Sequence, residues 1–267
     1  MPRILVAIAA TALLSACTTS PPLHDHDHAH DLGLQWVKSS AEYKAVSMVA
    51  YRNATDDLPR FIRDKSWNAL TGYGVPSDLP PAVILDVDET VVSNVDFQLT
   101  FERPFANHKL DTWSSNYNSM AIPGVVPFID LARKLGVTVF FVTNRPCQPK
   151  AGTDDPCPQK QTTIDDIREL SLEVLPEHVM LSGERPGWDK EKLSRREYIA
   201  QTHRVIMVIG DDLGDFIPCV RENPAGHCTE PATQESRLEA LQATKEFWGH
   251  GWYILPNPMH GSWTSVE

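Results

Sequence analysis

Three short runs of hydrophobic residues mark the middle of the chain, at residues 82–85, 137–142 and 205–209. Each run is nearly free of polar residues and rich in β-branched or aromatic side chains. Such runs are typical of strands that are buried on both faces of a parallel sheet. Helical patterns lie between them, and this alternation predicts an α/β fold with a doubly wound parallel sheet.

Hydrophobic periodicity also predicts a small helical region before the first strand. From Leu34 to Met48, hydrophobic side chains recur at steps of three and four residues, which is typical of an amphipathic helix. Between the first two strands, Pro127 and Gly136 are typical start and stop signals of another helix. A capping pattern at residues 162–165 predicts a third.

Polar residues follow all three predicted strands. Asp86 and Asp88 follow the first strand, Thr143 and Asn144 the second, and residues 210–212 the third. The carboxyl ends of parallel strands meet at one edge of a sheet, where open α/β sheets bind ligands. We therefore predict a functional site at this edge.

Length and charge narrow the class of protein. The 267 residues are enough for one large core, or for one core with a small appended lobe. The net charge of −11 argues against a nucleic acid polymer as partner, because phosphate backbones attract basic surfaces. A small phosphorylated substrate is compatible with this charge, since a metal ion and a few local cations would handle its phosphate.

The first residues predict export. Arg3 precedes a hydrophobic run at residues 4–14, which is too short for a membrane span of about 20 residues and is typical of a secretory signal. The sequence Leu-Ser-Ala-Cys at residues 14–17 resembles the bacterial lipobox, in which the cysteine is lipidated. The alternative is a plain signal peptide with an incidental cysteine. We predict a signal peptide at residues 1–16 and a lipid anchor on Cys17.

The anchor would be the only membrane attachment and would place the protein in the bacterial cell envelope. Thr18, rather than an acidic residue, follows the cysteine and favours the outer membrane. Residues 17–33 are predicted to form a tether with a histidine-rich tract. The tract either captures a transition metal or is a solvated spacer.

The four remaining cysteines fall into two close pairs, separated by ten and nine positions. An oxidising envelope favours disulfides between them. The alternative, a four-cysteine zinc site, normally has two to four residues within each pair. We therefore favour disulfides within the pairs Cys147–Cys157 and Cys219–Cys228.

Asp86 and Asp88 are two carboxylates at positions i and i+2 of an extended segment, so they point to the same side. One can attack phosphorus while the other carries a proton to or from the ester oxygen. The alternative, a calcium-binding loop, needs more oxygen ligands close behind. Val91 and Val92 interrupt that pattern.

The same segments resemble the haloacid dehalogenase (HAD)-like phosphotransferases. That signature is Asp-x-Asp-x-Thr after the first strand, Thr or Ser after a second, then a lysine and an acidic Gly-Asp cluster. The chain supplies these parts as Asp86-x-Asp88-x-Thr90, Thr143, Lys190 and residues 210–216.

Within this superfamily the chain is similar to the class C acid phosphatases, which include bacterial outer-membrane lipoproteins with 5′-nucleotidase activity. The similar segments span about residues 34–263. The chain departs from that pattern at the Cys147–Cys157 insertion, at Asp212 where an asparagine is usual, and in the histidine tract. The segments that carry the similarity are 36–43, 88–94, 142–145, 210–216 and 255–263.

The resemblance implies a role for each matched residue. Asp86 would be the nucleophile and a metal ligand, while Asp88 would exchange the proton and bind the metal through its backbone carbonyl. The implied metal is Mg²⁺, which prefers hard oxygen ligands. Lys190 would neutralise the phosphate, although Lys192, two positions on, is an alternative. Asp211 would be a further metal ligand, with Asp215 as a supporting one. Thr143 would hold a phosphoryl oxygen, and Asn144 would bind the substrate.

The resemblance also implies a cap over the site at residues 94–122, within a phosphatase domain at 34–267. Trp113 and Trp263 match positions where aromatic rings stack on a nucleobase, although aromatic side chains are often part of the core. The expected function is Mg²⁺-dependent hydrolysis of phosphomonoesters, such as nucleoside 5′-monophosphates, through an aspartyl-phosphate. The alternative is an inactive surface interaction or storage protein on this scaffold. The sequence leaves open whether the chain forms a homo-oligomer.

Overall fold

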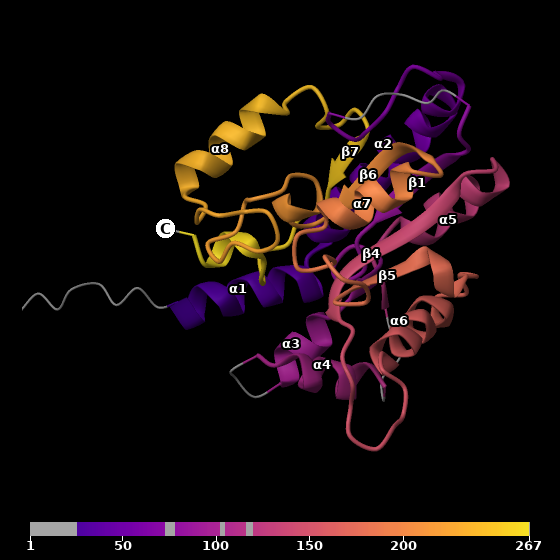
Figure 1. The fold of residues 1–267 in the computed structure, drawn as a ribbon. Helices are drawn as coiled ribbons and strands as arrows, with labels where there is room; N and C mark the ends of the chain where they lie inside the picture. The colour runs from indigo at the N-terminus through magenta and orange to yellow at the C-terminus, as the bar shows by residue number, and fades with distance from the viewer. Residues whose placement is uncertain (1–25, 73–77, 102–104, 116–119, 267) are drawn as a thin grey trace, which may run out of the picture.

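The computed structural model describes residues 26–72, 78–101, 105–115 and 120–266. Its centre is a five-stranded sheet in the order β5-β4-β1-β6-β7, and every neighbouring pair in it is parallel (Figure 1). The predicted doubly wound α/β fold is confirmed. The three predicted strands are β1 (Pro81–Leu85), β4 (Thr138–Pro146) and β6 (Arg204–Gly210), and the edge strands are β5 (Val179–Ser182) and β7 (Trp252–Ile254).

Strand β1 lies between β4 and β6. Leu85 at its carboxyl end pairs with Phe141 of β4 on one side and with Ile209 of β6 on the other. The chain therefore winds outward from β1 in both directions. The crevice beyond β1 is the topological switch point, where doubly wound sheets bind their ligands.

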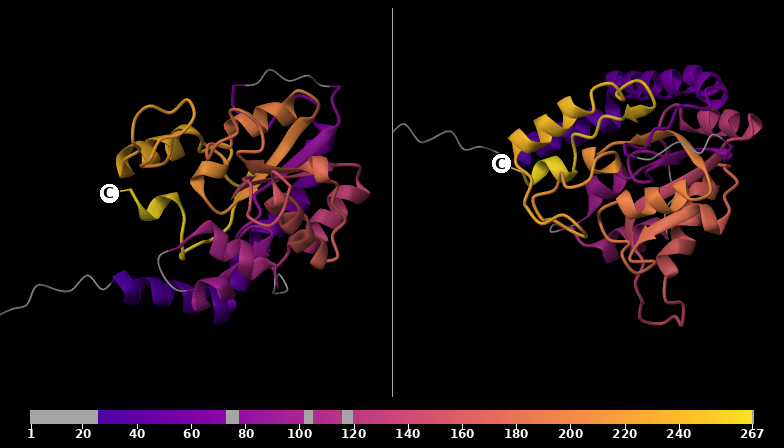
Figure 2. Two further views of the ribbon diagram at one scale, coloured as in Figure 1. Left: turned by 60° about the horizontal axis from the view of Figure 1, so that its bottom comes forward. Right: turned by 45° about the horizontal axis from the view of Figure 1, so that its top comes forward.

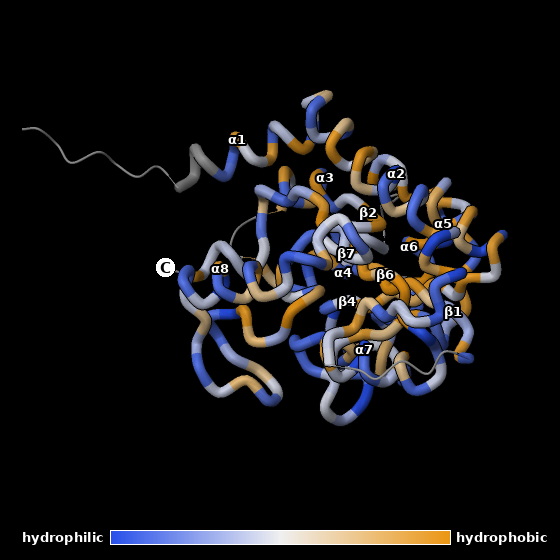
Figure 3. The backbone as a smooth tube through the Cα atoms, turned by 90° about the horizontal axis from the view of Figure 1, so that it is seen from above, coloured by the Kyte–Doolittle hydropathy of each residue, from blue (hydrophilic) through white to orange (hydrophobic). Residues whose placement is uncertain are grey.

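Alternate residues of β1 enter two separate cores. Val83 and Leu85 belong to the core beneath α2 (Ala41–Arg63), α5 (Val125–Lys134) and α6 (Pro158–Glu169), whereas Ala82 and Ile84 belong to the core on the α7 side (Leu193–Ala200). Successive strand side chains point to opposite faces, so burial of both faces requires a continuously hydrophobic strand. Figure 3 shows this hydrophobic centre in β1, β4 and β6.

The predicted helix over residues 34–48 is two helices. Helix α1 (His26–Ser39) ends before Ser40, whose hydroxyl accepts the Tyr43 backbone N–H at 3.0 Å and caps α2. The new helix restarts the periodicity, so Leu34 is buried while Met48 is 56% exposed. Because α1 begins at His26, residues 26–33 of the predicted tether are helical. Cys17 and the signal segment lie outside the described residues.

Two further helix starts differ from the sequence pattern. Helix α5 begins two residues before Pro127, and α6 begins at Pro158, four residues before the predicted capping pattern. Proline at the first helical position lacks only an N–H that would have no partner in the helix. Pro158 therefore starts α6 in place of Thr162.

The segment between β1 and α5 leaves the main sheet as a small separate layer. It contains α3 (Val95–Thr100) and α4 (Asn107–Ser114), and it is closed by an antiparallel pair of β2 (Val92–Ser93) with β3 (Met120–Ala121). Figure 2 shows α3 and α4 beside α1, away from the sheet. This cap-like segment lies near the carboxyl ends of β1 and β4, because residues of all three line one pocket.

The C-terminal part returns to the same region. The short helices η2 (Leu213–Asp215) and η3 (Ser262–Thr264) flank this region. Helix α8 (Gln234–Ala243) lies on the surface with no buried residue, and the short helix η1 (Pro176–His178) precedes β5.

The structure links Cys147 to Cys157 and Cys219 to Cys228 as disulfides, the pairs that the sequence spacing favours. Within the described residues, every helix is too short or too polar to cross a membrane.

Candidate active site

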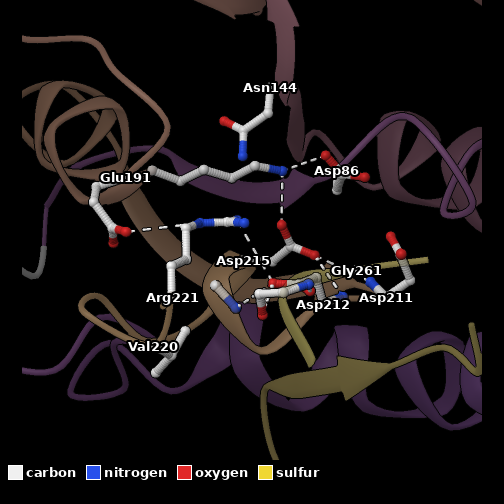
Figure 4. A network of polar contacts seen from close by, with 12 residues as sticks. Asp86, Asn144, Glu191, Asp211, Asp212, Asp215, Val220, Arg221 and Gly261 are labelled. Carbon is white, nitrogen blue, oxygen red and sulfur yellow. Dashed lines mark hydrogen bonds and ion pairs between the residues drawn. The ribbon is translucent and has the colours of Figure 1, made fainter. Parts of the chain in front are cut away.

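A pocket of about 1130 Å³ lies at the carboxyl ends of β1, β4 and β6. The segments after β1 and β6 supply Asp86 and Asp211, and the end of β4 supplies Asn144. The cap-like segment supplies Phe101 and Phe105, and residues 259–262 of the C-terminal segment also line the pocket. The three polar strand ends of the sequence thus meet in one cavity. Figure 4 shows Asp86, from the loop after β1, near Asp211 and Asp215, which both come from the segment after β6.

Lys192 is the cation at the centre of this cavity. Its ammonium group contacts Asp86 Oδ1 and lies 2.7 Å from Asp215 Oδ1. The lysine is 3% exposed and sits at the N-terminal end of α7. A buried charge of this kind is retained only where it is paired, and the two carboxylates provide the pairing.

The structure places Lys190 elsewhere. Lys190 lines the pocket but is exposed, whereas Lys192 is buried against Asp86. The structure therefore puts Lys192, the alternative that the sequence left open, in contact with Asp86, while Lys190 stays exposed at the pocket. The two lysines flank Glu191, whose backbone N–H donates to Asp189 Oδ1 at 2.7 Å in the turn before α7.

The acidic cluster is under electrostatic strain. Burial raises the pKa of Asp86 to about 7, opposed by Lys192 and reinforced by Asp215 and Asp88. Burial likewise raises the pKa of Asp211 far above its usual range, with further contributions from Asp86 and Asp215. Burial and the neighbouring carboxylates therefore favour the protonated forms of Asp86 and Asp211 in the protein without a bound cation.

Local hydrogen bonds hold the loop that carries Asp211. Asp215 Oδ2 accepts the backbone N–H groups of Asp211 at 3.1 Å and Asp212 at 3.0 Å. Gly210 permits this close approach, because a Cβ there would lie 2.6 Å from the Asp215 Cβ. Asp211 itself accepts hydrogen bonds from Thr90 Oγ1 at 2.9 Å and from Asn257 Nδ2 at 2.8 Å.

Asp212 fastens this loop to the C-terminal segment. Its carboxylate accepts the Ser262 hydroxyl at 2.9 Å, caps η2 through the Gly214 N–H at 2.8 Å and lies 3.6 Å from Arg221 Nη2 (Figure 4). Although burial alone would raise the pKa of Asp212, Arg221 and the hydrogen bonds hold that pKa below its usual range. Asp212, where the class C pattern usually has an asparagine, is therefore an ion-paired carboxylate that connects the loop after β6 to the C-terminal segment.

Asp88 faces an arginine rather than the acidic cluster. Arg145, at the end of β4, donates from Nη2 to Asp88 Oδ1 at 2.8 Å and pairs on its other side with Asp166 of α6. Burial alone would raise the pKa of Asp88, but Arg145 and Asn94 hold that pKa below its usual range. Thr143 Oγ1 lies 3.3 Å from Asp88 Oδ2.

A strained turn brings Asn94 to Asp88. Glu89 adopts a left-handed backbone with φ of 61°, and its buried carboxylate accepts the Asn94 backbone N–H at 3.0 Å. The Asn94 side chain then reaches Asp88 Oδ1 at 2.7 Å. Such strain at a non-glycine residue persists only where surrounding contacts enforce it, and here it positions a side chain of the site.

The two tryptophans expected to stack on a substrate do not line the pocket. Trp113 packs within the cap at 5.8 Å from the ring of buried Phe97, and Trp263 lies on η3 with 47% of its surface exposed. Phe101 and Phe105 line the pocket instead, with their rings 6.1 Å apart. Trp113 is half-buried, and its ring contact with Phe97 joins α4 to α3.

The donor set suits a hard divalent cation. Asp86, Asp211 and Asp215 each place a carboxylate oxygen within 4.8 Å of the others. Lys192 contacts two of these three carboxylates, and a bound cation would offset the burial and the mutual repulsion that raise the pKa values of Asp86 and Asp211. Asp215 Oδ2 accepts two backbone N–H groups and its Oδ1 pairs with Lys192, whereas each oxygen of Asp211 accepts one side-chain hydrogen bond, from Thr90 or from Asn257.

Sequence reasoning assigned no role to Arg145 or Asp166. Arg145 carries a local signal, because it follows Thr143 and Asn144 at the strand end. Asp166 carries none, since it lies in a helix 21 positions later. Only the packing of α6 beside β4 brings the two together.

Comparisons with known proteins agree with this geometry. The family model "HAD superfamily, subfamily IIIB (Acid phosphatase)" matches residues 24–263. Two structures of the class C acid phosphatase from Bacillus anthracis, one with tungstate bound, share 25% identity with this chain, covering 88% of it and 86% of theirs. Their TM-scores are 0.68 and 0.67. The chain therefore belongs to the subfamily IIIB acid phosphatases of the HAD superfamily and is a phosphomonoesterase acting on small phosphorylated substrates.

Proposed function

We propose that this phosphatase is Mg²⁺-dependent and works through an aspartyl-phosphate on Asp86. The observation that carries the proposal is the position of Asp86 at the switch point. Lys192 contacts its Oδ1, and the carboxylates of Asp211 and Asp215 lie beside it. A carboxylate nucleophile and a phosphate dianion repel each other, so the attack requires cations directed at the site.

The first step would transfer the phosphoryl group to the enzyme. The Asp86 oxygen that Lys192 leaves free attacks phosphorus, and the bond from phosphorus to the ester oxygen breaks. The leaving oxygen keeps the electron pair and takes a proton from Asp88, which therefore has to be protonated before the attack, although Arg145 and Asn94 favour its carboxylate form in the free protein. Lys192 and the Thr143 hydroxyl stabilise negative charge on the phosphoryl oxygens.

The second step would release phosphate. Asp88 accepts a proton from water as the water oxygen attacks phosphorus, and the bond from phosphorus to Asp86 breaks. Asp86 is restored as a carboxylate. Mg²⁺ held by Asp86, Asp211 and the Asp88 backbone carbonyl would neutralise negative charge on the phosphoryl group.

Nucleoside 5′-monophosphates are the proposed substrate class. The pocket is far larger than a phosphate group, and Phe101 and Phe105 give its cap side two aromatic faces. Aromatic side chains stack on nucleobases without strong preference among them. The relative from Bacillus anthracis binds tungstate, an oxyanion similar in shape to phosphate, which is compatible with the phosphoryl end of this arrangement.

The proposed location is the bacterial cell envelope, with Cys17 lipidated after removal of residues 1–16. The lipobox-like sequence and the hydrophobic run before it support this proposal. Two disulfides in the described structure are compatible with an oxidising compartment.

The decisive experiment compares wild type with Asp86→Asn on a panel of phosphomonoesters, with Mg²⁺ and with a chelator. We expect turnover only in wild type with Mg²⁺, and labelled phosphoryl groups trapped on wild type by acid quench but absent from Asp86→Asn. An amide cannot form the acyl-phosphate. Full activity in folded Asp86→Asn protein, or in wild type with chelator, would contradict the proposal.

A further inference from the structure

The two carboxylate oxygens of Asp88 have unequal surroundings. Oδ1 accepts three hydrogen bonds, from Asn94 Nδ2 at 2.7 Å, Arg145 Nη2 at 2.8 Å and Arg145 Nε at 3.1 Å. Within the described residues, Oδ2 accepts the shared Arg145 Nε at 3.1 Å and the Thr143 hydroxyl at 3.3 Å. Oδ1 is therefore the firmly held oxygen, and Oδ2 is the one with room for a proton.

Arg145 is itself fixed from behind. Its Nη1 pairs with Asp166, whose side chain is 2% exposed, and lies 3.4 Å from the Thr163 hydroxyl. Only 7% of the Arg145 side chain is exposed. Arg145 ends a central strand and Asp166 lies in the helix packed beside it, so both ends of this contact come from regular elements. Sites built on such elements hold their geometry more precisely than sites on loops.

We infer that Arg145, anchored by Asp166, is a positioning residue that holds Oδ1 of Asp88 so that Oδ2 exchanges the proton. The inference rests on the proposed function, in which Asp88 protonates the leaving oxygen. As the bond from phosphorus to that oxygen breaks, Oδ2 gives it the proton. In the second step the same Oδ2 takes a proton from the attacking water. Arg145 also lines the pocket, but in this role it keeps its own protons throughout.

Dependence on the leaving group separates this role from ordinary support of the fold. An alkyl phosphate releases a poor leaving alcohol, which needs protonation as the bond breaks. A nitrophenyl phosphate releases a stable anion that leaves without a proton. Because kcat/KM reports the steps up to loss of the alcohol, a damaged proton donor lowers this constant for the alkyl ester and largely spares the aryl ester. Misfolding lowers both equally.

The experiment measures kcat/KM for glycerol phosphate and for p-nitrophenyl phosphate in the same preparations. Asp88→Asn sets the reference, with a loss of about 10²–10⁴-fold expected on the alkyl ester. Arg145→Ala and Asp166→Asn should lower the alkyl-to-aryl ratio by at least about tenfold, a tenth of the smallest loss expected for the acid itself. Arg145→Lys should recover only part of the ratio, because an ammonium group cannot reproduce the guanidinium fork.

Arg195 provides the matched control. This second buried arginine donates to the Thr143 carbonyl and to Asn144 Oδ1, and its guanidinium hydrogen bonds in the described part of the chain do not include Asp88. Arg195→Lys should lower both substrates in equal proportion. The ratio is taken within one preparation, so it is independent of the folded fraction.

The outcomes separate the two ideas. A flat ratio in Asp88→Asn would remove the proton-donor role of Asp88 and the proposed mechanism with it. A selective loss in Asp88→Asn together with flat ratios in Arg145→Ala and Asp166→Asn would overturn the positioning role alone. An alkyl-to-aryl ratio that rises in Arg145→Ala would also overturn it, because Arg145 would then be restraining Asp88 rather than directing it.

Discussion

The Lys192 ammonium group lies 2.7 Å from the carboxylate of Asp215, at the point where the loop after β6 meets the start of α7. Asp215 in turn accepts two backbone N–H groups from its own loop, so it fixes the lysine from one side. The ammonium group is thereby directed at Asp86. Asp215 acts on the site chiefly by holding this cation and the Asp211 backbone.

Replacing this lysine should remove most of the activity. Lys192→Ala is expected to lower kcat/KM by about 10²–10³, the usual effect of losing one group that stabilises developing charge in a transition state. Lys190→Ala is the matched control, because it removes the exposed lysine two positions away. It should lower kcat/KM less than about tenfold. Steady-state kinetics with Mg²⁺ decide the question, and the reverse ranking would return the role to Lys190.

The acidic cluster predicts a characteristic pH dependence of stability in metal-free protein. Burial raises the pKa of Asp86 from 3.8 to about 7, so the folded state holds a proton that the unfolded state loses at lower pH. The stabilisation is complete below about pH 4 and disappears as the pH rises to about 7. Asp86→Asn lacks this dependence.

Thermal unfolding in chelator measures this effect. The melting temperature of wild type should fall relative to that of Asp86→Asn between about pH 4 and pH 7. Saturating Mg²⁺ should restore the wild type at the upper end, since it binds the ionised carboxylates. Parallel curves for the two proteins in chelator would show that Asp86 titrates near its ordinary pKa.

Phe101 and Trp113 are expected to differ in their effects on substrate choice. If a nucleobase stacks on Phe101, Phe101→Ala should lower kcat/KM for a nucleoside 5′-monophosphate by about five- to 150-fold, from a stacking energy of about 1–3 kcal/mol. Glycerol phosphate should be nearly unaffected. Trp113→Ala should affect both substrates alike, because this ring packs on Phe97. Equal losses on both substrates in Phe101→Ala would exclude stacking on this ring.

The proposed anchor leads to a partition experiment. Cys17→Ser should prevent lipidation and move the expressed protein from the detergent phase to the aqueous phase. Its phosphatase activity should persist, since residue 17 is remote in sequence from the catalytic segments. The same partition for both forms would indicate a plain signal peptide with an incidental cysteine.

The central strands were predictable because burial on both faces requires uninterrupted hydrophobic sequence, and the short length of these runs with their β-branched and aromatic residues favours strands over buried helices. Edge strand β7 has three residues, too few to give a periodicity, and was missed. The hydrophobic pattern from Leu34 to Met48 predicts one helix, but the structure has two that meet at Ser40. A serine within a continuing hydrophobic pattern does not indicate that one helix ends and another begins there.

By itself, the sequence determined the sheet, the edge that carries the site, and the identity of the acidic residues, because these depend on short-range patterns at strand ends. The tertiary structure decided which lysine meets Asp86, which aromatic rings face the pocket, and the pairing of Asp88 with Arg145 and Asp166. Each of these is set by how one element packs on another. Lys190 and Lys192 are only two positions apart, yet one is exposed and the other is buried against Asp86. Local sequence does not encode this difference, because it depends on how the turn before α7 packs on the rest of the site.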